Sequence, residues 1–252
     1  HNRVPIIEEL IAQGKVIEPL ADLYKVEVRE LAEKLSVPHE LIWRHPFPGP
    51  GLGVRLLCSD GKVVAPAVAD QLTEITAPFG LTAHALPIRS VGVKADIRCY
   101  EHPVLLSGEA SWGDLLEATR LILRDVPDVN RCIWNLGEAP GDFTPVEATM
   151  TRSRLDLLRE ADHLVMTGLR RHGLYDEIWQ CPTAMIPLTI DGQGRELVVA
   201  RPIHSKRAMT AQPAQLPDAL LAELRRDILA LDGVSGLALD LTSKPPGTIE
   251  WE

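Results

Sequence analysis

The last residues of the chain contain side chains that could bind an anion. Residues 240–252 read DLTSKPPGTIEWE, so Lys244 follows the hydroxyls of Thr242 and Ser243 and precedes two prolines. An ammonium group is a compact charge that suits a phosphate, and neighbouring hydroxyls add hydrogen-bond donors. The other interpretation is a solvated lysine in a disordered terminus. The pattern alone leaves both open.

A second segment that could contact a ligand is rich in proline and glycine. Residues 44–53 read RHPFPGPGLG, which alternates residues that forbid a helix with residues that free the backbone. We expect an irregular loop there. Its backbone amides could approach a ligand, or the loop could be a simple linker.

Composition excludes several classes of protein. The chain has 252 residues, 45% of them hydrophobic, and a formal net charge of −9, which argues against a nucleic-acid partner. Its four cysteines, Cys58, Cys99, Cys132 and Cys181, form no Cys-x-x-Cys pair, so we expect buried or half-buried thiols without metal or disulfide. The lack of a long apolar run or signal pattern predicts a cytoplasmic protein without a membrane partner.

Hydrophobic spacing predicts the elements that would position these segments. A surface helix is expected at 18–35, closed by Ser36-Val37-Pro38, and a shorter one at 68–76. A longer helix is expected at 154–171, with Ser153 and Asp156 as cap residues. The chain opens with His1-Asn2 and no methionine, so we expect a piece of a longer protein.

One order of elements is predicted twice. The first copy has strands at 86–93 and 98–106, a helix from a Ser111–Asp114 capping box to 124, and a strand at 131–136. The second copy has strands at 183–190 and 196–203, a helix at 217–231, and a strand at 237–241. The predicted fold class is therefore α+β, with two β-β-α-β copies.

Four motifs then resemble one family. These are residues 45–52 (HPFPGPGL), 89–96 (RSVGVKAD) with Arg98 and Tyr100, 173–180 (GLYDEIWQ), and 242–252 (TSKPPGTIEWE). In this order and over nearly the whole chain, they resemble the carboxy-terminal portion of GMP synthetases. The long segment between the first and third motifs is similar to the enlarged dimerisation region of the human-type enzymes.

The resemblance implies a ligase of purine nucleotide biosynthesis that is also a glutamine amidotransferase. In that family ATP adenylates xanthosine monophosphate (XMP), and ammonia from glutamine displaces AMP to give GMP. The glutaminase domain and the ATP pyrophosphatase domain, where ATP and Mg²⁺ bind, have no counterpart motif here. We therefore expect no catalytic residue in this chain, and a homodimer as its assembly.

The resemblance also implies domain boundaries. Residues 1–44 would be the last helical elements of the pyrophosphatase domain. Residues 45–150, with an insertion at 59–84, would be a first dimerisation subdomain. Residues 151–252 would be a second one that carries an XMP-binding tail.

Site residues follow from the resemblance position by position. Lys244 matches a family lysine that meets the substrate phosphate, and Glu250 matches a tail residue of the same pocket. Gln180 and Asp96 match two further residues that contact the nucleotide. For Asp96 a turn aspartate remains the alternative, and for Gln180 a glutamine at the edge of a strand.

One position departs from the family pattern. Many relatives have an arginine eight positions before the tail lysine, where this chain has Gly236, although Arg131 stands at the equivalent step of the first copy. Either another residue such as Arg201 compensates or the affinity for phosphate is lower. A rival interpretation also stays open: a stand-alone, non-catalytic nucleotide-binding or scaffold protein that kept only this region.

Overall fold

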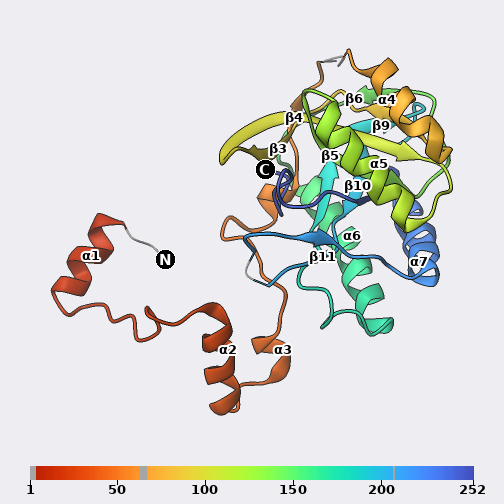
Figure 1. Ribbon diagram of the computed structural model, residues 1–252. Helices are drawn as coiled ribbons and strands as arrows, with labels where there is room; N and C mark the ends of the chain where they lie inside the picture. Colours follow the sequence, from red (N-terminus) through yellow and green to blue (C-terminus); the bar gives the residue numbers. More distant parts are fainter. Residues whose placement is uncertain (1–3, 63–66, 207) are drawn as a thin grey trace. The chain divides into compact units, whose positions relative to one another are not determined.

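The computed structural model describes residues 4–62, 67–206 and 208–252 (Figure 1). The chain divides into two units, residues 1–44 and 45–252. No helix in the described part is long and apolar enough to cross a membrane.

The first unit is helical. It contains α1 (Pro5–Ala12), α2 (Lys25–Lys34) and α3 (His39–Ile42). The predicted helix at 18–35 is too long at its start, because Tyr24 caps α2: its backbone N–H donates to Glu27 Oε2 over 2.6 Å. The predicted stop is confirmed, since α2 ends before Ser36, which has a left-handed φ of 58°. Helix α1 was not predicted from the sequence.

The second unit is built on a mixed sheet. Its strands lie in the order β2 (Thr82–Ala85), β4 (Ile97–Ser107), β5 (Val129–Asn135), β13 (Val234–Asp240), β10 (Glu196–Ala200) and β8 (Thr183–Ile186). The pairings alternate from one edge to the other: antiparallel, parallel, antiparallel, parallel, antiparallel. The series of parallel and antiparallel pairings is therefore the same from either edge. The chain is of mixed α+β class.

Helices cover one face of this sheet, and other segments cover the opposite face. The helices are α4 (Ala69–Thr76), α5 (Trp112–Asp125), α6 (Arg152–Arg171) and α7 (Asp218–Leu229). Alternate strand residues divide between the faces: Val104 and Leu106 pack with α4 and α5, whereas Leu105 packs with Trp251 on the other side. The strands are buried on both faces, which explains their nearly continuous apolar sequences.

The predicted hairpin at 86–106 is real, but its strands are placed differently. β3 (Ser90–Lys94) pairs with the first half of β4, and β2 pairs with the second half. The ladder from β4 to β5 shifts register between His102 and Pro103, because proline has no N–H to donate. β2 therefore lies at one edge of the sheet as β8 does at the other, and it begins in the predicted insertion and ends one residue beyond it.

Prolines also divide the predicted strands of the second copy. Pro187 separates β8 from β9 (Leu188–Ile190), which pairs with β6 (Phe143–Pro145). Pro202 separates β10 from β11 (Ile203–His204), which pairs with β12 (Gln212–Pro213). A further short pair joins β1 (Ser59–Asp60) to β7 (Glu147–Ala148).

Two helix caps were predicted, with different outcomes. The Ser111 cap of α5 is confirmed, since Ser111 Oγ accepts from the Asp114 N–H over 3.1 Å. The Ser153 and Asp156 cap of α6 is wrong. Thr151 is the cap, because its Oγ1 accepts from the Arg154 N–H over 3.3 Å.

Two smaller expectations are partly correct. The Pro/Gly loop is irregular up to Pro50 and then forms the 3₁₀ helix η1 (Gly51–Arg55). A second 3₁₀ helix, η2 (Ala77–Phe79), follows α4.

The expectation of buried or half-buried thiols is correct for three of the four cysteines. Cys132 and Cys181 are buried and Cys99 is half-buried, but Cys58 is exposed.

Candidate functional site

The carboxy-terminal tail, residues 241–252, is held in place by its neighbours. Leu241 donates to Cys132 O over 2.9 Å, and Lys244 exchanges backbone hydrogen bonds with Ala211. Val93 donates to Pro246 O over 2.7 Å, and Val91 donates to Trp251 O over 3.1 Å. The tail is therefore part of the folded unit, which contradicts the interpretation of a disordered terminus.

Below the tail lies a fully buried group of charges. Asp240 Oδ2 accepts from Arg131 over 3.0 Å, and Asp240 Oδ1 lies 2.7 Å from Arg201 NH1 in a second ion pair. The side chains of all three residues are 0% exposed. Burial lowers the pKa of Arg131 to about 10, although Asp240 opposes that shift. One carboxylate thus compensates two guanidinium groups away from water, and removing it would leave uncompensated buried charge.

Arg131 connects this group to the tail. Its NH2 atom donates to Thr248 Oγ1 over 2.6 Å and to Glu250 O over 2.8 Å. Its guanidinium lies 4.8 Å from the ring centroid of Trp251, whose indole N–H donates to Asp240. The backbone around Glu250 is therefore fixed by charge-assisted hydrogen bonds.

The side chain of Glu250 belongs to a second cluster, which joins three of the sequence motifs. Arg55 Nε and NH2 donate to the two Glu250 oxygens over 3.1 and 3.3 Å, and Gln180 Nε2 donates to Oε1 over 3.2 Å. The Arg55 guanidinium lies 5.0 Å from the Phe47 ring centroid. Gln180 and Glu250, two of the predicted site residues, are thus in direct contact.

Helix α6 adds a carboxylate to this cluster. Asp162 Oδ1 lies 3.6 Å from Arg55 NH1 and is a buried atom without a hydrogen-bond partner among the described residues. Burial raises the pKa of Asp162, and the charge of Arg55 opposes that rise. The signal for Asp162 was visible in the sequence as an acid on the apolar side of a predicted helix.

The Pro/Gly loop is anchored beside the same cluster. The rings of His45 and Tyr175 stack with centroids 4.2 Å apart, and His45 Nε2 lies 2.8 Å from Tyr175 O. Burial lowers the pKa of His45. The first and third sequence motifs therefore touch each other.

Lys244 lies on the tail and is half-buried. Its Nζ donates to Ala208 O over 2.7 Å. An ammonium group has three N–H donors, so this contact leaves two of them for a ligand.

Asp96 takes no part in the cluster that joins Gln180 to Glu250. It is exposed in the two-residue turn between β3 and β4, where Lys94 pairs with Ile97. Ala95 and Asp96 have φ of 49° and 62°, as a type I′ turn requires, and aspartate tolerates that conformation. The turn alone is enough to account for an aspartate at this position.

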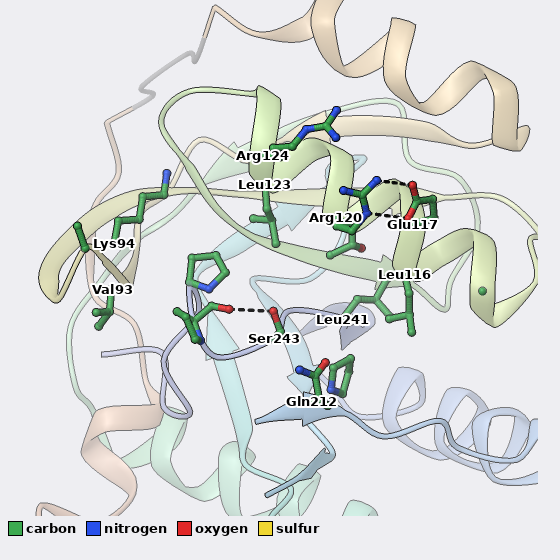
Figure 2. A pocket seen from close by; sticks show the side chains of 16 residues that line it. Val93, Lys94, Leu116, Glu117, Arg120, Leu123, Arg124, Gln212, Leu241 and Ser243 are labelled. Carbon is green, nitrogen blue, oxygen red and sulfur yellow. Dashed lines mark hydrogen bonds and ion pairs between the residues drawn. The ribbon is translucent and has the colours of Figure 1, made fainter. Parts of the chain in front are cut away.

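A groove of about 800 Å³ runs between this hairpin, the tail and α5 (Figure 2). Lys94 and Ala95 line it from the hairpin, and Ser243 and Pro245 line it from the tail. The groove therefore lies beside two predicted residues, Asp96 and Lys244. Its cations are paired: Lys94 with Glu101, Arg120 with Glu117, and Arg124 with Asp125.

The structure also shows what surrounds the position that departs from the family pattern. Gly236 is buried in β13, and a Cβ there would lie 2.8 Å from Ile190 and 3.2 Å from Leu197. A larger side chain would collide with the apolar core. Arg201 is fully buried against Asp240 and does not reach the surface.

Part of the chain matches a known domain family. Residues 167–251 match the family described as the GMP synthase C terminal domain. That segment contains Gln180, Lys244 and Glu250.

Relatives match the whole chain. It is 39% identical to a probable glutamine-hydrolysing GMP synthase of Leptospira interrogans and 30% identical to one of Caenorhabditis elegans. It is 29% identical to the glutamine-hydrolysing GMP synthase of Dictyostelium discoideum. The chain spans 42%, 44% and 42% of the lengths of these relatives.

Proposed function

We propose that this chain is the XMP-binding and subunit-pairing part of a glutamine-hydrolysing GMP synthase. The observation that carries the proposal is the ordered tail, which presents Lys244 and also holds the Glu250 carboxylate against Gln180. A cation suits the phosphate of XMP, and a carboxylate and an amide suit hydroxyl or ring N–H donors.

In this proposal the remaining chemistry belongs to other parts of the enzyme. ATP and Mg²⁺ bind to a pyrophosphatase domain, of which residues 1–44 are the last elements, and ammonia comes from a glutaminase domain. We expect the 252-residue chain alone not to form GMP from XMP, ATP and ammonia. GMP formation by this chain would refute the domain assignment.

Calorimetric titration of the complete enzyme with XMP tests the role of Lys244. A charge-assisted hydrogen bond to phosphate contributes roughly 1.5 to 3 kcal/mol, so Lys244→Met should weaken XMP binding about tenfold or more. Lys244→Arg should keep part of the affinity, since it keeps the charge. Wild-type affinity in Lys244→Met would mean that the tail is purely structural.

We also infer a twofold homodimer. The hairpin of β3 and β4 carries Ile97 and Tyr100, which are 71% and 51% exposed, and such apolar surface favours burial against a second copy. Light scattering at high micromolar concentration should give twice the mass of one chain. A monomer there would contradict the inference.

The rival proposal is a stand-alone scaffold protein without catalytic domains. The intact mass of the protein in its own cells separates the two. A mass more than twice that of this chain would exclude the scaffold.

A further inference from the structure

Arg55 occupies an unusual place between the segments that form the proposed XMP site. It lies at the end of η1, just after the Pro/Gly loop, and is only 3% exposed. Its guanidinium reaches the tail through Glu250, α6 through Asp162 and the loop through Phe47. One side chain thus contacts segments that are far apart in the sequence.

The geometry of the Arg55–Glu250 contact is that of a fork. Two different nitrogen atoms of Arg55 donate to two different oxygen atoms of Glu250. Such a bidentate pair fixes the plane of the carboxylate as well as its position. Gln180 Nε2 donates to one of these oxygens, so the orientation of its amide depends on the same contact.

We propose that Arg55 is a positioning residue for XMP, because it holds the Glu250 carboxylate and, through it, the Gln180 amide in the orientation that receives the nucleotide. This inference rests on the proposed function. Arg55 is buried behind Glu250 and acts through it, without touching XMP. Its effect on XMP therefore requires an intact Glu250.

A double-mutant cycle in the complete enzyme tests this dependence. Arg55→Lys keeps a cation near Asp162 but loses the fork, and we expect the KM for XMP to rise about tenfold with little change in kcat. Glu250→Gln should also raise that KM. The double variant Arg55→Lys/Glu250→Gln should match Glu250→Gln within about twofold, because the fork is already lost.

Arg154 provides the matched control. It is a buried arginine whose Nε and NH2 donate to Glu196, and its guanidinium also donates to the carbonyls of Leu57 and Thr149. Arg154→Lys should lower thermal stability about as much as Arg55→Lys while leaving the KM for XMP unchanged. An equal rise of KM in both variants would mean a general loss of packing and would overturn the positioning role.

The remaining outcomes separate the two proposals. If Glu250→Gln and Lys244→Met both leave XMP binding at the wild-type level, the proposed site is wrong, and the role of Arg55 falls with it. If they weaken binding while Arg55→Lys behaves as wild type, only the positioning role is overturned. If the KM increases of the two single variants multiply in the double variant, the positioning role is overturned as well, since Arg55 would then act independently of Glu250.

Discussion

Trp251 donates its indole N–H to Asp240, with 3.1 Å between Nε1 and Oδ2. Asp240 is the last residue of β13, and Trp251 is 1% exposed and packs with the apolar face of the sheet. The tail therefore leaves the sheet at Asp240 and returns to the same residue. Whatever loosens this contact should loosen the segment that carries Lys244 and Glu250.

Trp251→Phe should test that relationship, because phenylalanine keeps an apolar ring but lacks the indole N–H. The variant loses a hydrogen bond to a charged group, which contributes about 1.5 to 3 kcal/mol, and leaves Asp240 with the two arginines. We expect the free energy of unfolding to fall by at least that amount in urea titrations, because the smaller ring also leaves a cavity. Hydrogen exchange at Val91, which donates to Trp251 O, should become faster. Unchanged exchange there would argue that Trp251 does not retain the tail.

Asp240→Asn should be more damaging. It keeps the shape of the side chain but removes the charge that compensates Arg131 and Arg201, and breaking a buried ion pair costs roughly 3 to 5 kcal/mol. Urea titration gives the free energy of unfolding. The control is Glu117→Gln, which removes an exposed partner of Arg120 and should not change stability measurably.

Gly92 tests how closely the tail approaches the hairpin. A Cβ at this position would lie 2.9 Å from both Asn130 and Pro246 O, so Gly92→Ala must move the tail away from β3. We expect a loss of about 1 to 3 kcal/mol in the free energy of unfolding and weaker XMP binding. Gly113→Ala is the control, because its nearest neighbour, Ser111 Oγ, would be at an ordinary 3.7 Å. Equal XMP affinity in the two variants would contradict the prediction.

Much of the fold follows from local sequence signals. The cap at Ser111 and the apolar spacing of α5, α6 and α7 predicted these helices to within a few residues. β2 was missed because its residues, TAHA, lack the β-branched alternation of a typical strand. Its place in the sheet comes from pairing with β4, which is a long-range contact.

The candidate site was predicted less completely than the fold. Lys244 and Glu250 stand out by composition and by resemblance to the family. Arg55 was not singled out, because its role depends on contacts with Asp162 and Glu250, which are 107 and 195 residues away in the chain. Arg201 was considered for phosphate, and only its burial against Asp240 shows another role.

Asp162 gives the last prediction, on the pH dependence of stability. Burial raises its pKa in the folded chain above the ordinary value of 3.8, against the opposing effects of Arg55, Thr183, His45 and Arg170. The folded state then binds a proton more tightly than the unfolded state, so the contribution of Asp162 to stability is present at low pH. It is lost as the pH rises from about 3.8 through the raised pKa.

Asp162→Asn removes this titration. The free energy of unfolding of wild type, relative to that of Asp162→Asn, should therefore decrease as the pH rises from about 4 to 7. Urea titrations of both proteins across that range measure the difference. Asp156→Asn is the control, with the titrations extended below pH 4, since hydrogen bonds from Arg152 lower the pKa of this exposed carboxyl below 3.8. The stability of wild type relative to Asp156→Asn should decrease as the pH falls below about 4, which is the opposite direction. If the two differences run in the same direction, the buried environment does not control the ionisation of Asp162.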